Sequence, residues 1–350
     1  MTLDEAITQI EPPDHHIAAQ VQVRLDRLTK PRGSLGRLEE VAVRYATIIG
    51  EVLPKVPRGA VFTFAADHGV AIEGVSAYPR EVTQQMVLNF LRGGAGVNVL
   101  ARHTGVEVRV VDIGVAAEFR TIPQLIQQKV MPGTRNFLVE QAMSREQARR
   151  ALEVGTMLAL DAARDGIGLI GTGEMGIGNT TASAAITTLL TGRPVAEVTG
   201  RGTGIDDTTH QHKVSVIRRA LDRHRPDPTD ALDVLAKVGG LEIAGLAGLM
   251  LGAAARRIPV VLDGFIAGAA ALIAVALQPH CREYLIASHR SVEPGHQAVL
   301  EQLRLRPLLD LDLRLGEGTG ACLGMGLVQA AVKVLTEMAT FDEAGVSDRG

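Results

Sequence analysis

Hydrophobic positions in the first fifty residues recur with the spacing of an α-helix. In LEEVAVRYATIIGEV, 38–52, the apolar residues from Leu38 to Val52 fall on one helical face. A second helix is predicted at 16–28, and the turn-rich sequence TKPRGSLG joins the two. The proline-containing segment 54–58 then interrupts the helical pattern, so we expect a boundary there.

A different pattern repeats beyond this boundary. Short apolar runs end in polar or glycine residues, and a helical segment follows each of them; the runs lie at 60–65, 106–111, 166–170, 259–262, 283–287 and 311–315. Continuous apolar strands that alternate with helices are typical of a parallel sheet covered on both faces. Ligands of such sheets bind outside the carboxyl ends of the strands, where these polar residues gather.

The composition narrows the class of protein. The chain has 350 residues and a net charge of −3, which favours neither nucleic acid nor an anionic membrane as a partner. The amino terminus lacks the apolar segment of a secretory signal, and the longest apolar run, 265–277, is shorter than the ~20 residues that cross a bilayer. The only cysteines, Cys281 and Cys322, have no metal-binding spacing. We therefore expect a cytoplasmic protein without a metal site.

The stretch GTGEMGIGNTT, 171–181, carries the first candidate chemistry. Its glycines match the dinucleotide pattern GxGxxG, and a helix from Thr180 would present its amides and dipole to an anion. Glu174 argues against a dinucleotide. A carboxylate ~5 Å from a phosphate charge costs about 3 kcal/mol at an effective dielectric of ~20, whereas a helix N-terminus returns only ~0.3–1 kcal/mol. Glu174 is either a solvated loop residue or faces a positive centre, such as the anomeric carbon of a ribose phosphate.

Two further glycine-rich segments follow. In TGRGTGIDDTTHQHK, 199–213, the glycines permit close backbone approach and Lys213 adds positive charge; the segment is either a second anion-binding loop or a structural turn. In GEGTG, 316–320, Glu317 stands between two glycines at the predicted end of a strand. A flat ligand can approach such a carboxylate, and partial desolvation raises its pKa toward that of a general base. The alternative is a helix-capping glutamate.

The histidines are less specific. His210 and His212 are two residues apart and would face different directions on a helix, which makes a poor zinc pair. Asp67-His68 and Ser288-His289-Arg290 stand at predicted strand ends. Substrate binding and structural hydrogen bonding are both open for them.

Taken together, these segments resemble one family, the nicotinate-nucleotide–dimethylbenzimidazole phosphoribosyltransferases. The likeness covers most of the chain, in order: KPRGSLGRLE (30–39), AADHGV (65–70), YPREVTQQMV (78–87), RGGAGVNVLAR (92–102), GEMGIGNTT, GRGTGIDD, LDGFIAGAAA (262–271), SHRSVEPGH (288–296) and RLGEGTGA (314–321). It implies a three-layer α/β/α, Rossmann-like parallel sheet over 58–319, a small helical subdomain from 1–57 and 320–350, and a homodimer.

The resemblance also implies an activity. Phosphoribose would pass from nicotinate mononucleotide to 5,6-dimethylbenzimidazole or a related base, giving α-ribazole 5′-phosphate and nicotinate for the nucleotide loop of cobalamin, with no cofactor or metal. Glu317 would be the base, and Glu174 would stabilise positive charge at the sugar. The other site residues implied are Gly176, Gly178, Asn179, Gly202, Gly204, Lys213 and Ser291 for the nucleotide and its phosphate, and Tyr78, Gln85, Met86 and Leu315 for the acceptor base.

Two other functions remain open. The glycine pattern at 171–176 suggests an NAD-dependent oxidoreductase. A non-catalytic nucleotide-binding module would use the same anion loops but would leave Glu317 without a role.

Overall fold

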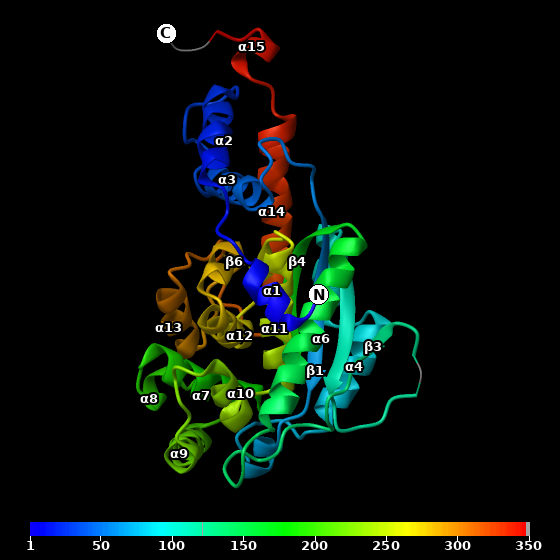
Figure 1. Cartoon of the computed structure of the whole chain (residues 1–350), viewed down its shortest axis with the longest axis vertical. Coiled ribbons are helices and arrows are strands. Elements are labelled where there is room, and N and C mark those ends of the chain that lie inside the picture. Colours follow the sequence, from blue (N-terminus) through cyan, green and yellow to red (C-terminus); the bar gives the residue numbers. More distant parts are fainter. Residues whose placement is uncertain (121, 348–350) are drawn as a thin grey trace.

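A computed structural model describes residues 1–120 and 122–347 of the chain. Its centre is a six-stranded, all-parallel sheet of order β3-β2-β1-β4-β5-β6 (Figure 1). The order of the strands reverses between β1 and β4, as in doubly wound folds. The strands are β1 (Arg58–Ala66), β2 (Glu107–Gly114), β3 (Leu125–Gln127), β4 (Ile167–Met175), β5 (Val260–Leu262) and β6 (Leu285–Ala287).

Both faces of the sheet are buried, which explains the continuous apolar runs. Along β1, Phe62 and Phe64 belong to one hydrophobic core, whereas Val61 and Ala65 belong to the other. One face is covered by α6 (Arg145–Arg164), α11 (Leu241–Ala255) and α12 (Phe265–Leu277), and the other by α4 (Val82–Arg92), α5 (Gly96–Thr104) and α14 (Thr319–Glu337). The predicted three-layer α/β/α arrangement is confirmed.

The small residues of α11 serve packing within the chain. A Cβ atom added at Gly248 would lie 1.9 Å from the carbonyl oxygen of Leu152, and one added at Gly155 would lie 1.8 Å from that of Gly245. The backbones of α6 and α11 therefore touch where these glycines stand. The neighbour that the small residues of α11 require is α6 of the same chain.

Helices from the two ends of the chain gather at one end of the molecule (Figure 1). α2 (His15–Arg27) and α3 (Arg37–Ile49) pack against α14, and α15 (Phe341–Ala344) follows it. The amide of Thr29 donates to the carbonyl of Ala339 over 3.0 Å, which ties the two ends together. α1 (Leu3–Gln9) instead packs on α6 and α11. The division at residues 58 and 319 stays a prediction.

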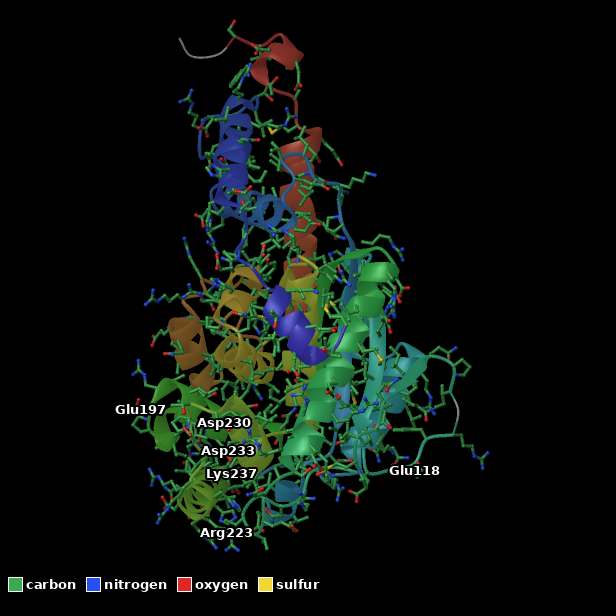
Figure 2. The ribbon with its side chains drawn as sticks, viewed as in Figure 1. Glu118, Glu197, Arg223, Asp230, Asp233 and Lys237 are labelled. Atoms are coloured by element: carbon green, nitrogen blue, oxygen red, sulfur yellow. The ribbon has the colours of Figure 1, made fainter. Side chains whose placement is uncertain are left out.

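The remaining helices connect these layers: η1 (Gly69–Glu73), α7 (Asn179–Thr191), α8 (Val195–Val198), α9 (Asp207–His224), α10 (Ala231–Val238), η2 (Pro279–Tyr284) and α13 (Pro294–Leu303). Charged side chains on their outer sides are visible in Figure 2. On α10, for example, Lys237 pairs with Asp233 over 2.8 Å, and Asp230 caps the first turn. This partly buried pair, one helical turn apart, stabilises the helix.

The strand predicted at 311–315 is wrong. This segment lies outside the sheet, Asp312 has a left-handed φ of 53°, and Leu311 and Leu315 are 53% and 60% exposed. The strand that completes the six is instead β3, which was not predicted because its three residues form too short an apolar run to be recognised. β4 also continues past its predicted end to Met175, so Gly171 and Gly173 lie inside the sheet.

Within the described residues, α14 is the one helix with the length and hydropathy of a membrane span. Of its most apolar window, 56% is buried inside the protein, against the sheet and against α3 and α5. The composition of α14 is therefore explained by its place in the core.

Candidate active site

A cavity of about 530 Å³ opens at the carboxyl edge of the sheet. Its walls come from the ends of β4, β5 and β6, from α4, and from segments 202–203 and 314–317. This is where open α/β sheets bind ligands. The predicted site residues that line it are Glu317, Glu174, Gly176, Gly178, Asn179, Gly202, Ser291, Tyr78, Met86 and Leu315; those that do not are Gly204, Lys213 and Gln85.

Glu317 is fixed by both its backbone and its carboxylate. Its φ angle of 64° is left-handed, between Gly316 and Gly318, which are left-handed too. Such a conformation is uncommon for a residue with a side chain. The carboxylate accepts a 3.2 Å hydrogen bond from the amide of Val97, in the first turn of α5, and the side chain is nearly buried. A helix N-terminus thus holds the candidate base in position.

The neighbouring glycines bring Glu317 close to β4. A Cβ at Gly173 would lie 2.3 Å from the carbonyl oxygen of Glu317, and one at Gly318 would lie 2.6 Å from Cγ1 of Val61. A Cβ at Gly316 would lie 2.3 Å from Oε1 of Glu174. The glycines of both motifs are therefore needed for contact between the two carboxylate-bearing segments.

The dinucleotide interpretation loses its structural basis for the same reason. In that fingerprint the first glycines form a phosphate-binding turn after a strand. Here Gly171 and Gly173 lie within β4, paired with Val61 and Thr63 of β1. Gly171 also leaves room for Met325 of α14, whose sulfur would lie 2.7 Å from an added Cβ. Only Gly176 of the pattern belongs to a loop.

Asp263 holds the Glu317 loop from the other side, a role that was not predicted from the sequence. It follows β5, and its carboxylate accepts hydrogen bonds from the amides of Gly318, Gly320 and Ala321, of 3.1, 2.7 and 3.1 Å. These amides are the unsatisfied donors at the start of α14. The signal was visible in LDGFIAGAAA, where an Asp-Gly pair ends a strand.

Glu174 shares the cavity wall with Glu317 and Asp263. Its carboxylate accepts a hydrogen bond from the side-chain amide of Asn179. Burial, followed by the negative charges of Asp263 and Glu242, raises the pKa of Glu174 to about 8. Burial also raises the pKa of Glu317, against the hydrogen bonds from the α5 amides. The main causes of the two pKa shifts include no basic side chain, although Arg314 lines the same cavity, so the carboxylate wall suits a positively charged ligand.

A surface suited to an anion adjoins Glu174. α7 begins at Asn179 without a side-chain cap, after Gly178 at a φ of 96°. Uncapped amides and the positive end of a helix dipole attract a phosphate or carboxylate. Gly202 enters from a neighbouring loop, and Ser291 lines the same cavity. One cavity thus joins a carboxylate wall to an anion site.

Lys213 lies behind this surface. Its ammonium donates to the hydroxyl of Thr180 over 2.7 Å, and its side chain is fully buried. Burial, against the attraction of Glu293, lowers the pKa of Lys213 to about 8. Thr180 lines the cavity, so Lys213 influences the cavity through its hydrogen bond to the Thr180 hydroxyl. Glu293, which was not predicted from the sequence, lines the cavity and accepts a 2.9 Å hydrogen bond from the amide of Gly202.

Apolar side chains stand at the mouth of the cavity. Tyr78 is 55% exposed and Leu315 is 60% exposed. Both line the cavity, and so does Met86 of α4. Exposed apolar groups around a cavity are typical of a ligand-binding surface. Gln85, also on α4, is exposed outside this cavity.

Of the histidines, His289 lines the cavity, and burial lowers its pKa to about 4. His68 is fully buried, 2.7 Å from Glu242, and does not line it. Arg290 pairs with Asp310 at the surface. Across residues 1–120 and 122–347, no group of three or more His, Cys, Asp or Glu is placed to hold a metal ion.

Comparison with known proteins decides the family. A family model described as a phosphoribosyltransferase matches residues 10–346. Proteins named nicotinate-nucleotide–dimethylbenzimidazole phosphoribosyltransferase from Geobacter sp. (strain M21) and Chloroflexus aggregans are each 61% identical over 99% of this chain, covering 99% and 98% of their own lengths. The chain belongs to this family.

The structure of a family member agrees with this assignment. The crystal structure of CobT from Thermus thermophilus superposes with a TM-score of 0.91 at 51% identity, over 96% of this chain and 100% of that one. The resemblance seen in the motifs is confirmed, and the chain is a phosphoribosyltransferase of this family.

Proposed function

We propose that this phosphoribosyltransferase moves phosphoribose from nicotinate mononucleotide to 5,6-dimethylbenzimidazole or a related base, giving α-ribazole 5′-phosphate and nicotinate. The observation that supports this proposal most directly is the position of Glu317. Its side chain is buried against the N-terminus of α5, and it lines the same cavity as Glu174 and the uncapped start of α7. Relatives that are 61% identical carry this activity in their names. The product serves the assembly of the nucleotide loop of cobalamin.

Glu317 acts as the general base. One ring nitrogen of the benzimidazole donates its lone pair to the anomeric carbon, while Glu317 accepts the proton of the other nitrogen. The raised pKa of Glu317 strengthens it as a proton acceptor. Its two left-handed glycine neighbours leave space for a flat ring beside the carboxylate.

Glu174 acts on the sugar. The bond between the anomeric carbon and the pyridinium nitrogen breaks, and its electrons return to the ring and neutralise the ring charge as nicotinate leaves. Positive charge develops on the anomeric carbon, as in glycoside hydrolysis. A positive ligand beside Glu174 favours its ionised form and so opposes the burial that raises its pKa to about 8. Attack from the face opposite nicotinate converts the β-nucleotide into an α-product.

The remaining predicted residues bind the two ends of the substrates. The 5′-phosphate contacts the amides at Gly176, Gly178 and the start of α7, with Asn179, Gly202 and Ser291 around it. Lys213 supports this contact through Thr180, and Gly204 shapes the loop that carries Gly202. The acceptor base lies against Tyr78, Met86 and Leu315, with Gln85 on the rim. No metal or cofactor takes part.

The direct test is nicotinate release. The protein is mixed with nicotinate mononucleotide and dimethylbenzimidazole, and nicotinate and the α-nucleotide are quantified by chromatography. We expect both products in equal amounts. Binding of the nucleotide with no turnover on any benzimidazole or purine would instead support the non-catalytic module, and tight NADH binding would support the oxidoreductase.

We propose further that the enzyme works in the cytoplasm as a homodimer, independent of nucleic acid and membrane. The net charge of −3 is in keeping with this. Leu311 is exposed and lines a groove together with Leu323 and Leu327 of α14. A second copy of the chain would cover this groove. Sedimentation equilibrium of the purified protein checks the dimer: a single monomer mass at micromolar concentration contradicts it.

A further inference from the structure

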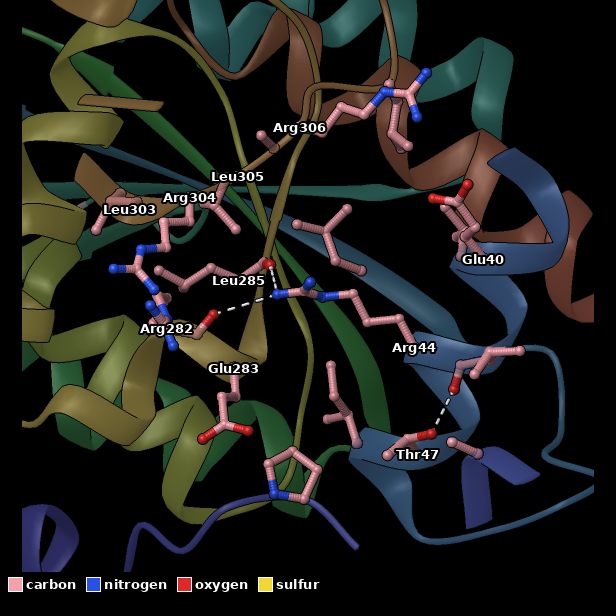
Figure 3. A pocket seen from close by; sticks show the side chains of 18 of the residues that line it. Glu40, Arg44, Thr47, Arg282, Glu283, Leu285, Leu303, Arg304, Leu305 and Arg306 are labelled. Carbon is pink, nitrogen blue, oxygen red and sulfur yellow. Dashed lines mark hydrogen bonds between the residues drawn. The ribbon is translucent and has the colours of Figure 1, made fainter. Parts of the chain in front are cut away.

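A second cavity, of about 510 Å³, lies beside the edge strand β6 (Figure 3). Its walls come from α3, from residues 282–287 and from residues 303–308, and it shares no lining residue with the candidate active site. Neither the family resemblance nor the proposed reaction gives this cavity a role. It is a basic, concave surface that the proposed function does not use.

Arginine is the commonest charged residue of its lining. Five arginines and two glutamates face the cavity: Arg37, Arg44, Arg282, Arg304, Arg306, Glu40 and Glu283. The glutamates are already engaged, Glu40 with Arg37 and Glu283 with His280 and His15. Within residues 1–120 and 122–347, Arg282, Arg304 and Arg306 have no carboxylate within ion-pair distance. The cavity therefore has a surplus of positive charge.

Arg44 shows how closely these charges are held. It reaches from α3 to the carbonyl oxygens of Leu285 and Arg282, at 2.6 and 3.3 Å, and Figure 3 shows Arg282 and Arg304 on the wall that it faces. Burial lowers the pKa of Arg44, and repulsion from Arg37 and Arg282 adds to that effect, against the attraction of Glu283. Like charges gathered in this way are unfavourable until an anion joins them.

Two buried donor atoms of the arginines that line the cavity also lack hydrogen-bond acceptors. The Nε atoms of Arg37 and Arg44 are buried, and neither has a hydrogen-bond partner among the described residues. Buried donors in folded proteins are nearly always paired, because an unpaired one costs its full desolvation. Both atoms are covered by the protein, so a ligand in the cavity would contact the more exposed guanidinium groups of Arg282 and Arg304 instead. Guanidinium groups match phosphate oxygens in both charge and geometry.

The walls also offer apolar surface. Val41 of α3, Ile286 of β6 and Leu305 line the same cavity between the arginines. The volume of about 510 Å³ is that of a site for a nucleotide-sized molecule, beyond what a bare phosphate ion fills. The lining thus combines an anion site with a place for an organic group.

We propose that this arginine cavity is a second ligand site, which binds an organic phosphate of nucleotide size with its phosphate on Arg282 and Arg304 and its apolar part against Val41, Ile286 and Leu305. The site is independent of the phosphoribosyl transfer. Arg44 is a structural member of it, because its guanidinium is already bonded to the backbone beside β6.

Isothermal titration calorimetry on the full-length protein tests the proposal, with ADP as the probe and pyrophosphate as a purely inorganic one. The test variant is Arg282→Gln/Arg304→Gln. The matched control is Arg218→Gln/Arg219→Gln, which removes the same charge from exposed positions of α9. Both variants keep the candidate active site unchanged, so phosphate binding there contributes equally to the two measurements. A difference in ADP affinity between the variants therefore reports binding in the arginine cavity.

We expect ADP to bind the native protein and the control equally, and the test variant about 10- to 100-fold more weakly, the scale of losing charged hydrogen bonds. Pyrophosphate should bind more weakly than ADP, because it lacks an apolar part. Equal ADP affinity in the two variants overturns the site. Pyrophosphate binding as tight as ADP overturns its assignment to an organic phosphate.

Discussion

The two cavities of this molecule hold charge in opposite ways. In the candidate active site, the carboxylates of Glu317 and Asp263 are buried and hydrogen-bonded to backbone amides, and glycines let the segments around them pack closely. In the arginine cavity, long side chains, two of them exposed, gather around an open space. Proton transfer and attack on carbon require atoms in fixed positions, whereas attraction of an anion requires mainly charge. Side-chain length and backbone support thus distinguish a reactive site from a binding site.

The largest effect is expected from Glu317→Gln. The variant keeps the shape and the hydrogen bond to the amide of Val97 but removes the proton acceptor, so kcat should fall by about 10²–10⁴-fold. Steady-state nicotinate release measures this, with Glu146→Gln on the surface of α6 as the matched control. Near-normal turnover of Glu317→Gln would remove Glu317 as the base.

Gly318→Ala tests the rigidity of the carboxylate site. The added Cβ meets Val61 in a left-handed backbone, and we expect a loss of about 2–4 kcal/mol in unfolding free energy together with lower activity. Gly166→Ala is the control, since Gly166 is also left-handed but has open space around it. It should cost only ~1 kcal/mol. Equal losses in the two variants would show that close packing is not what holds Glu317.

Glu174 gives a pH-dependent signature. Its pKa rises from 4.5 to about 8 on folding, so between these values the native state binds a proton that the unfolded state does not, and stability declines as pH rises. Glu174→Gln removes this dependence. Relative to the native protein, the variant should therefore gain at least ~1 kcal/mol between pH 5 and pH 8, since one pKa unit is worth ~1.4 kcal/mol. Urea unfolding at the two pH values measures it; a constant difference contradicts the raised pKa.

Lys213→Ala should have a smaller effect, confined to nucleotide binding. The ammonium supports Thr180 from behind the cavity wall, so its loss should raise the KM for nicotinate mononucleotide several-fold and leave the KM for the base unchanged. Thr180→Val, which removes the connecting hydroxyl, should give a similar change. If Lys213→Ala binds the nucleotide normally, its link to the phosphate is absent.

The smallest effect on turnover is expected in the other cavity. Arg282→Gln/Arg304→Gln should change basal kcat by less than about twofold, because neither side chain lines the candidate active site. The nicotinate-release assay without added phosphate ligand measures this. A tenfold loss would mean that the two cavities are not independent.

The sequence predicted the fold well because its strongest signals are local. Apolar runs such as 60–65 are buried on both faces, so they read as strands without tertiary information. The segment 311–315 alternates leucines with charged residues, and two of its three leucines, Leu311 and Leu315, are exposed outside the sheet. The glycines at 171 and 173 misled because their partners, Val61 and Thr63, are more than a hundred residues away.

For the candidate site, the residues within the motifs could be predicted from the sequence, but the residues that hold those motifs in place could not. Glu317 and Glu174 carry the chemistry in short glycine-rich stretches, and the structure places both in one cavity. Asp263 and Glu293 act through backbone amides of distant loops; the Asp-Gly pair at 263–264 marks the end of a strand, but it does not reveal which loop the carboxylate holds. The position of Lys213 behind Thr180, rather than in the cavity, likewise depends on how α9 packs.

One helix connects the candidate base to the far end of the molecule. α14 begins two residues after Glu317 and runs without interruption for 19 residues, a length of about 28 Å. Glu337, the exposed last residue of α14, therefore lies about this distance along the helix from the candidate base. A fluorescent label attached there would leave the carboxyl edge of the sheet free, whereas the same addition at a loop of that edge would obstruct the entry of substrate.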